Sequence, residues 1–320
     1  MTDNDDIKQA SSAPVAMFVY NRADNTQQII EHLIANTLAS QTNLYVFSDG
    51  GKDEASWAAV NEVRQYLHKV KEEVEQTHAL RSMTIVERKE NIYLEKNITS
   101  GIMEVFAHHD RIIVLEDDIV TSPYFLQYMN DAFNLYRDEP RVMHVAGFTN
   151  LCIDDIPFYF TPHMSGWGWG TWRDRWLGHF RHYKTRQQAL EGMTQSDCDA
   201  MQYGGVFPCL RSLDKDPIPW DICWEIAIYK AQGLCLTPGR TLVRNIGLKR
   251  GTHFRSFDIL QSYEFDRPPM QSPLPLTKIT SPQPSPRTES LFAEAIRDWG
   301  IRYTPLGKVV RFVYKKLRFS

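Results

Sequence analysis

The chain has 320 residues, of which 42% are hydrophobic and 23% charged, so it can form a substantial core. Its formal net charge of −3 argues against a general nucleic-acid binder, whose phosphate contacts would require a basic face. The five cysteines include no C-x-x-C pair, which argues against a disulfide framework or a zinc site and indicates free thiols in a reducing compartment.

Neither end of the chain carries a membrane-spanning signal. Residues 1–14 are acidic and polar, without the positive start and apolar stretch of a signal peptide, and are expected to be a disordered leader. No apolar run approaches the ~18 residues that a membrane span needs. We therefore expect a cytoplasmic protein, either soluble or peripheral to the inner face of the cell membrane.

Apolar runs alternate with amphipathic segments over residues 15–147. This alternation predicts crossover units, and hence an α/β fold with a mostly parallel central sheet flanked by helices. The expected strands cover residues 15–20, 44–48, 83–87 and 111–115, and the expected helices include one that begins at about Asp53 and one over about 95–109.

The alternation fades after about Gly147, and one clear helix is predicted near 220–232. Residues 266–288 contain seven prolines and three serines, which indicates an extended linker or lid. We accordingly expect one domain over 15–265, with a nucleotide-binding half at about 15–147 and an acceptor half at about 148–265, followed by a helical tail at 289–320.

The sharpest chemical signal is VLEDDIVTSPYF, in which an apolar strand runs directly into Glu116, Asp117 and Asp118. Ligands of open α/β sheets bind at such carboxyl ends of strands. Three adjacent carboxylates repel one another unless a cation or hydroxyl groups share them, and hard oxygen ligands suit Mg²⁺ or Mn²⁺. The alternative is an acidic solvated turn.

This segment resembles the acidic motif of GT-A glycosyltransferases, in the E-D-D form of N-acetylglucosaminyltransferase I and related bacterial surface-polysaccharide enzymes. The resemblance extends over about residues 14–255 and includes FVYNR and FSDGG. It implies that Tyr20, Asn21 and Arg22 contact the nucleotide and that Asp49 reads the uracil ring. It also implies that Glu116 and Asp117 face the donor sugar and ribose, and that Asp118 holds the metal.

The residues give independent but weaker support for two of these roles. Asp49 follows a strand of the same sheet, and Gly50 and Gly51 would let a planar base approach the backbone. A D-G-G sequence is also common in tight turns. Arg22 offers a bidentate fork to a phosphate, although a single arginine after a strand is often a solvated loop residue.

The segment HMSGWGWGTWRDRW, residues 163–176, contains four tryptophans interleaved with glycines. Tryptophan faces stack on sugars, and glycines let a ligand approach the backbone. The segment resembles the G-x-G-W stretch beneath the sugars in the same family, which makes Gly168 and Trp169 candidate sugar-binding residues. Aromatic core packing is the alternative.

The segment PIPWDICWEIAIYKAQGL predicts a mostly buried helix with two carboxylates, Asp221 and Glu225, one turn apart. Buried carboxylates are costly without a partner or a function. The resembling family carries its catalytic base in a W-D-D-W segment, whereas this chain has W-D-x-x-W. Asp221 is therefore our first candidate for the base and Glu225 the second. The alternative is that Asp221 caps the helix.

Two features remain near the C-terminus. His253, in RGTHF, is a candidate to complete the metal shell, with a structural role as the alternative. Residues 305–320 have apolar and basic positions on separate helical faces, which predicts either peripheral contact with an anionic membrane or a helix packed on the domain.

Together these features predict a metal-dependent glycosyltransferase that moves a sugar from a nucleotide-diphosphate donor, with UDP-sugars favoured, to a saccharide or lipid-linked saccharide. The resemblance implies inversion at the anomeric carbon. One alternative is a nucleotidyltransferase acting on sugar phosphates, although FVYNRADN lacks the glycine-rich triphosphate loop. The other is a non-catalytic carbohydrate-binding protein, which would not need three carboxylates at a strand end.

Overall fold

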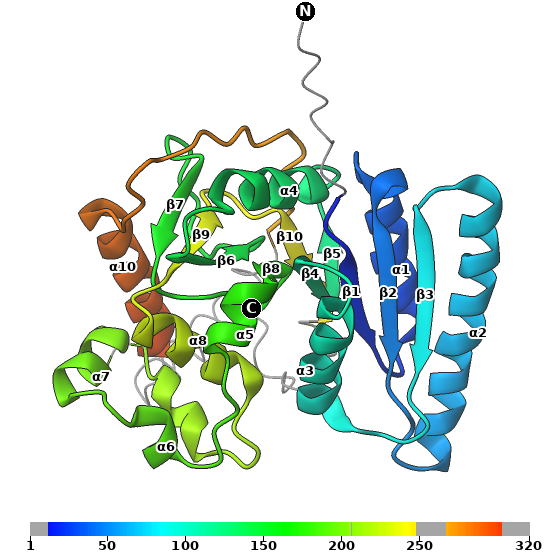
Figure 1. Cartoon of the computed structure of the whole chain (residues 1–320), viewed down its shortest axis with the longest axis horizontal. Coiled ribbons are helices and arrows are strands. Elements are labelled where there is room, and N and C mark those ends of the chain that lie inside the picture. Colours follow the sequence, from blue (N-terminus) through cyan, green and yellow to red (C-terminus); the bar gives the residue numbers. More distant parts are fainter. Residues whose placement is uncertain (1–11, 206, 248–266, 303–320) are drawn as a thin grey trace, which may run out of the picture.

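The computed structural model describes residues 12–205, 207–247 and 267–302 (Figure 1). The expected leader, except for its last three residues, lies outside these ranges, as do His253 and the basic segment 305–320. Within the described part of the chain, no helix is both long and apolar enough to cross a membrane.

The first half of the chain forms four parallel strands in the order β3-β2-β1-β4. All four lie where the sequence predicted strands, and the helices between them make the expected crossovers. The long helix α2 begins directly after Asp53, as predicted, because the Asp53 carboxylate accepts a hydrogen bond from the Ser56 amide at 2.7 Å. The elements are β1 (Val15–Val19), α1 (Ala23–Ile34), η1 (Ala39–Gln41), β2 (Asn43–Ser48), α2 (Glu54–Thr77), β3 (Ser82–Glu87), α3 (Tyr93–Phe106) and β4 (Arg111–Glu116).

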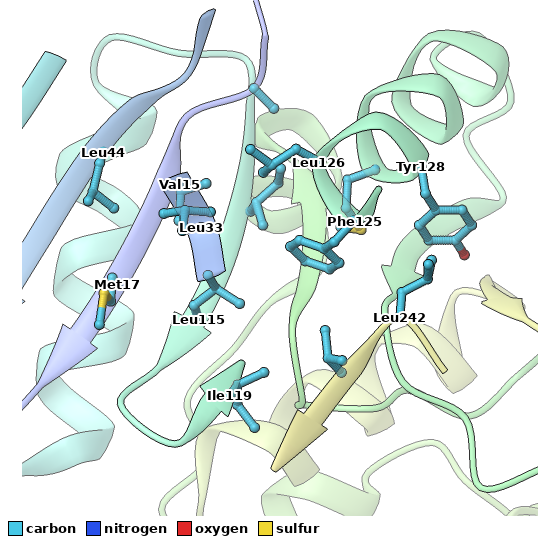
Figure 2. Close-up of a cluster of buried hydrophobic side chains, with 14 of the residues drawn as sticks. Val15, Met17, Leu33, Leu44, Leu115, Ile119, Phe125, Leu126, Tyr128 and Leu242 are labelled. Atoms are coloured by element: carbon cyan, nitrogen blue, oxygen red, sulfur yellow. The ribbon is translucent and has the colours of Figure 1, made fainter. Parts of the chain in front are cut away.

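β1 is apolar along its whole length because both of its faces are covered. Val15 and Met17 belong to one core layer, which also contains side chains of α1 and α2. Ala16 and Phe18 belong to the opposite layer, with side chains of α3. Figure 2 shows part of the first layer, where Val15 and Met17 lie near Leu115 of β4. Burial on both faces is the environment of parallel strands.

The second half extends the same sheet with shorter strands, and the full order is β3-β2-β1-β4-β8-β6-β9-β7. β8 is antiparallel to both β4 and β6, whereas β9 is parallel to β6. A separate two-stranded sheet joins β5 and β10. The further elements are β5 (Ile119–Thr121), α4 (Phe125–Tyr136), β6 (Val142–Ala146), β7 (Phe158–Thr161), β8 (Trp169–Trp172), α5 (Arg173–His179), α6 (Arg186–Leu190), α7 (Gln195–Met201), η2 (Cys209–Asp214), α8 (Trp220–Lys230), β9 (Leu234–Pro238), β10 (Val243–Asn245) and α10 (Pro286–Arg302).

Helices cover both faces of this sheet. Side chains of α1, α2 and α4 share one core layer, and those of α3, α5 and α8 share the other (Figure 1). The predicted α/β class, with a mostly parallel central sheet flanked by helices, is confirmed. All five cysteines are free, and three of them, Cys198, Cys223 and Cys235, are buried.

The proline-rich segment is fixed to the domain over its described residues. The Met270 amide donates to the Thr241 carbonyl at 2.9 Å, and the Ile279 amide donates to the Tyr136 hydroxyl at 3.0 Å. Leu274 is buried. The segment leads into α10, which begins at Pro286, slightly before the expected start of the helical tail.

Candidate active site

Glu116, Asp117 and Asp118, here called the acidic triplet, lie where the strand order reverses. β2 and β3 extend the sheet from one side of β1, and β4 lies on the other side, so the carboxyl ends of β1 and β4 flank the switch point at which open α/β sheets bind ligands. Phe18 of β1 is level with Glu116 of β4, so both strands end together. Residues that directly follow the two strands therefore meet at one edge of the sheet.

Arg22 and the triplet meet at this edge. The Arg22 guanidinium donates to both carboxylate oxygens of Asp117, through Nη2 to Oδ1 and through Nε to Oδ2 at 3.2 Å. The third guanidinium nitrogen, Nη1, lies 3.5 Å from Oδ2 of Asp118. The Tyr20 amide also points at Asp117, at 3.4 Å. Arg22 is thus a counter-ion of the triplet and not a solvated loop residue, whereas Asn21 is exposed.

Burial raises the pKa of all three carboxyl groups of the triplet. Burial raises the pKa of Glu116 well above its ordinary value, and the charges of Asp118 and Asp117 raise it further. Burial also raises the pKa of Asp117 to about 6, although Arg22 opposes the shift. The pKa of Asp118 is raised by burial as well, against the effect of Arg22. A bound cation or hydroxyl donors would therefore stabilise the ionised carboxylates of this cluster.

β10 brings a second segment against Asp118. The Ile246 amide donates to the Asp118 carbonyl at 2.8 Å, and a hydrogen bond from the Asn245 side chain favours the ionised Asp118 carboxylate. A Cβ added to Gly247 would lie 2.5 Å from Oδ2 of Asp118, so only glycine fits there. No sequence pattern identifies Asn245 or Gly247 as site residues, because their approach to Asp118 depends on the pairing of β10 with β5.

Asp49 lies at the end of the neighbouring strand, buried, and organises the loop before α3. Its Oδ1 accepts hydrogen bonds from the Gly50 and Ile92 amides, both at 2.9 Å. Packing of the chain against itself is one reason for Gly50 and Gly51. A Cβ at Gly50 would lie 2.3 Å from the Glu90 carbonyl carbon, and one at Gly51 would lie 2.5 Å from the Trp57 ring. The chain itself fills both spaces.

A lysine and two tyrosines lie beside this loop. The Lys52 ammonium lies 5.0 Å from the ring centroid of Tyr93 and 5.8 Å from that of Tyr20. Tyr93 is 62% exposed and has a positive φ of 63°, an uncommon backbone conformation for a tyrosine. The sequence analysis did not identify Lys52 or Tyr93, because neither belongs to a recognisable motif.

The tryptophan segment is mainly core. Trp169 is fully buried, stacked between His144 at a centroid distance of 5.2 Å and Trp220 at 5.1 Å. This burial favours the core-packing alternative for Trp169 over direct contact with a sugar. Gly168 has a φ of +60°, and a Cβ there would lie 2.8 Å from Cγ1 of Val243, so close packing explains this glycine too.

The stack holds the start of α8, where the first candidate base lies. Asp221 is the second residue of this helix, whose N-cap position is Pro219, so Asp221 is not the cap. Its Oδ1 accepts a hydrogen bond from the Ile222 amide at 2.7 Å. The residue keeps exposed surface, but partial burial of its carboxyl group raises the pKa. The charge of Asp221 also raises the pKa of Glu116, so the start of α8 acts electrostatically on the triplet.

Glu225 has a different environment one turn later. Its Oε1 lies 2.5 Å from Nδ1 of His163, and its Oε2 accepts from the Met164 amide at 2.8 Å. His163 and Glu225 are both buried. Because both carboxylate oxygens already have partners inside the fold, the structure favours Asp221 over Glu225 as a group that could accept a substrate proton.

The structure therefore brings Arg22 together with Glu116, Asp117 and Asp118, and the charge of Asp221 acts on Glu116. Asp49 follows the adjacent strand, and Gly168 and Trp169 support the site from the core. Among the described residues, no group of three or more histidines, cysteines, aspartates or glutamates is arranged to hold a metal ion by itself. His253 lies outside the described residues.

No protein-family model and no curated protein matches the sequence. Solved structures show slight likenesses. S. aureus TarS 1–349 in complex with UDP has a TM-score of 0.31 and 15% identity over 42% of this chain and 34% of its own, so this chain spans about a third of that protein. The mannosyltransferase PcManGT from Pyrobaculum calidifontis, in complex with GDP-Man and Mn²⁺, has a TM-score of 0.38 and 12% identity over 70% of this chain and 74% of its own.

A UDP-glucose pyrophosphorylase complexed with UDP-glucose has a TM-score of 0.37 and 9% identity over 71% of this chain and 90% of its own. The three proteins include two kinds of enzyme, and the likeness to each is slight. It does not identify an activity for this chain.

Proposed function

We propose that this chain is a metal-dependent glycosyltransferase that moves a sugar from a nucleotide-diphosphate donor to a saccharide or lipid-linked saccharide. One observation carries the proposal. Three adjacent, largely buried carboxylates, paired with Arg22, lie at the switch point of a parallel sheet, and the charge of Asp221, from the other half of the chain, acts on Glu116. Donor and acceptor chemistry would meet between these groups.

The residues fit a divalent cation of the Mn²⁺ or Mg²⁺ type. Asp118 offers a hard oxygen ligand whose side chain is still 19% exposed, and the neighbouring carboxylates make the site strongly negative. Such cations commonly bind through one or two carboxylates together with substrate phosphates, not in an all-protein cage. When bound, the cation would neutralise charge on the leaving diphosphate. His253 remains a candidate for a further ligand.

The chain's own residues would perform the other steps. Arg22 would turn part of its guanidinium fork to the diphosphate, as arginine does in phosphate sites. Glu116 and Asp117 would accept hydrogen bonds from sugar and ribose hydroxyls. Asp221 would take the proton from the acceptor hydroxyl as its oxygen attacks the anomeric carbon, which gives inversion. UDP-sugars are the donors favoured by the assignment of Asp49 to the uracil ring.

Product analysis tests this proposal. The full chain is incubated with a panel of UDP- and GDP-sugars, with Mn²⁺ or with excess chelator, and release of the nucleoside diphosphate is measured. We expect release of UDP only with the metal. Pyrophosphate release from UTP and a sugar phosphate would instead identify a nucleotidyltransferase, and binding of saccharides without any turnover would identify a carbohydrate-binding protein.

A further inference from the structure

A glutamate outside the acidic triplet connects the two halves of the site. Glu95 lies in the first turn of α3, and its Oε2 accepts a hydrogen bond from the Trp220 amide at 2.5 Å. Trp220 is the first residue of α8, whose N-cap residue, Pro219, provides no side-chain cap. The first amide of α8, which would otherwise have no helical partner, is thus capped by a residue 125 positions earlier in the chain.

This contact fixes the helix end that carries Asp221. Trp220 is also held by its stacking on Trp169, so both its backbone and its ring have fixed positions. Asp221 follows directly and binds the next amide, that of Ile222. Loss of the Glu95 contact would leave the Trp220 amide without this cap, and the residue would then be held mainly by the stacking of its ring on Trp169.

Glu95 is also electrostatically coupled to Asp221. Burial raises the pKa of Glu95 to about 7; the hydrogen bond from Trp220 opposes this shift, the charge of Asp221 adds to it and that of Lys215 opposes it. The other titratable groups that face this pair are Glu116, Glu225 and Cys223. At a pH below about 7 the Glu95 carboxyl is mostly neutral, and above it a second negative charge stands beside Asp221.

Asp49, on the nucleotide side of the proposed site, contacts the start of the helix that carries Glu95. Asp49 binds the Ile92 amide, and Ile92 is the N-cap residue of α3. A continuous set of contacts therefore runs from the loop after β2, through the first turn of α3, to the first turn of α8.

We propose that Glu95 is a positioning residue that holds Asp221 in place and, when ionised, increases its affinity for the acceptor proton. The inference rests on the proposed function, in which Asp221 is the base. A negative charge beside a carboxylate makes that carboxylate a stronger base, and general-base catalysis gains from a base whose pKa lies nearer the working pH.

The Glu95→Gln variant separates charge from position. Its amide oxygen can still accept from Trp220, but the side chain cannot ionise. In the wild type we expect kcat to rise with pH twice: once at lower pH, where Asp221 ionises, and again through about pH 7, where Glu95 ionises. We expect Glu95→Gln to lose the second rise.

Glu95→Ala, which also loses the cap, should show a kcat at least about tenfold lower at every pH with little change in donor KM. Glu104→Gln, on the same helix and paired with Arg88, is the matched control and should keep the wild-type profile.

A second readout does not depend on turnover. In ¹H–¹⁵N spectra the Trp220 amide should titrate near pH 7 in the wild type and not in Glu95→Gln. A wild type that transfers sugar with a pH profile unchanged by Glu95→Gln overturns the inference alone. A wild type that transfers nothing overturns the proposed function and the positioning role of Glu95 with it, while the Trp220 titration still reports the contact between the helices.

Discussion

Both halves of the chain contain buried carboxylates, but the groups that contact these carboxylates differ between the halves. In the first half, Asp117 and Asp118 share one arginine, and burial raises the pKa of each. In the second half, the Glu225 carboxylate is paired with His163 and a backbone amide. Burial of an acid therefore does not by itself mark a catalytic group. What distinguishes the triplet is that three carboxylates lie next to one another and that burial raises the pKa of each.

Asp221 lies in the second half of the sequence, but its charge acts on a residue of the first half. It lies on the same helix as Glu225, yet its charge acts on Glu116 across the sheet edge. The proposed site therefore combines a rigid nucleotide-side cluster with one carboxylate from the acceptor half. Variants in each half test this division.

The largest effect is expected for Asp118→Asn. The substitution keeps the shape of the side chain but removes the charged oxygen ligand, so turnover should be abolished and donor binding weakened. Steady-state rates with Mn²⁺ measure the first effect, and calorimetry with UDP measures the second. Asp138→Asn, at an exposed position after α4, is the control. Full activity of Asp118→Asn in excess chelator would rule out the metal assignment.

Asp221→Asn should follow, with a transfer rate lower by the ~10²–10⁴ typical of a lost general base. Donor affinity should stay close to wild type, because the missing interaction belongs mainly to the transition state.

Glu225→Gln is the matched comparison on the same helix. It weakens the pairing with His163, so we expect a loss of about 1–3 kcal/mol in unfolding free energy with little change in rate. If Glu225→Gln instead cripples transfer while Asp221→Asn only lowers stability, the base is Glu225. If neither variant slows transfer, a retaining mechanism replaces the inverting one.

The sequence predicts the first half of the fold well because its signals are local. β1, β2 and β4 each contain a continuous apolar run, and Asp53 caps the helix after the β2 loop as helix-start rules predict. The triplet follows from the same logic, since polar residues directly after such strands converge at one sheet edge.

The remaining site residues depend on distant contacts that no local pattern encodes. From the sequence, Glu95 is an ordinary acidic residue in the first turn of α3, and only its contact with α8 gives it a further role. Gly247 contacts Asp118 only because β10 pairs with β5. The tryptophan segment misleads for a related reason. Its spacing suits a sugar platform, but the antiparallel placement of β8 between β4 and β6 turns Trp169 into the core.

Asp49→Ala should weaken UDP binding by roughly 1–3 kcal/mol, the typical cost of an unmatched buried hydrogen-bond partner. Because Asp49 also holds the Ile92 amide, Asp49→Asn is the sharper variant. It keeps an oxygen for the backbone amides but presents a donor to a uracil N–H. Titration calorimetry should find both variants weakened. If Asp49→Asn binds UDP like the wild type, Asp49 acts through the loop and the base is read elsewhere.

The smallest effect concerns glycines of the second half. Gly168→Ala should lower the unfolding free energy by about 1–3 kcal/mol, because the left-handed backbone and the contact with Val243 both oppose a Cβ. Gly178→Ala, with open space around the added carbon, should be neutral or stabilising by up to about 1 kcal/mol. Equal denaturant midpoints for the two variants would contradict this description of the packing around β8.

The central claim is that the triplet and a nucleotide diphosphate bind a divalent cation together. Electron paramagnetic resonance of Mn²⁺ measures this directly, because the signal of the free ion falls when the ion is bound. The account predicts that UDP and the wild-type chain together deplete free Mn²⁺ far more than the sum of either alone, and that Asp118→Asn removes the excess. Depletion by UDP alone, unchanged by the wild-type chain, would contradict it.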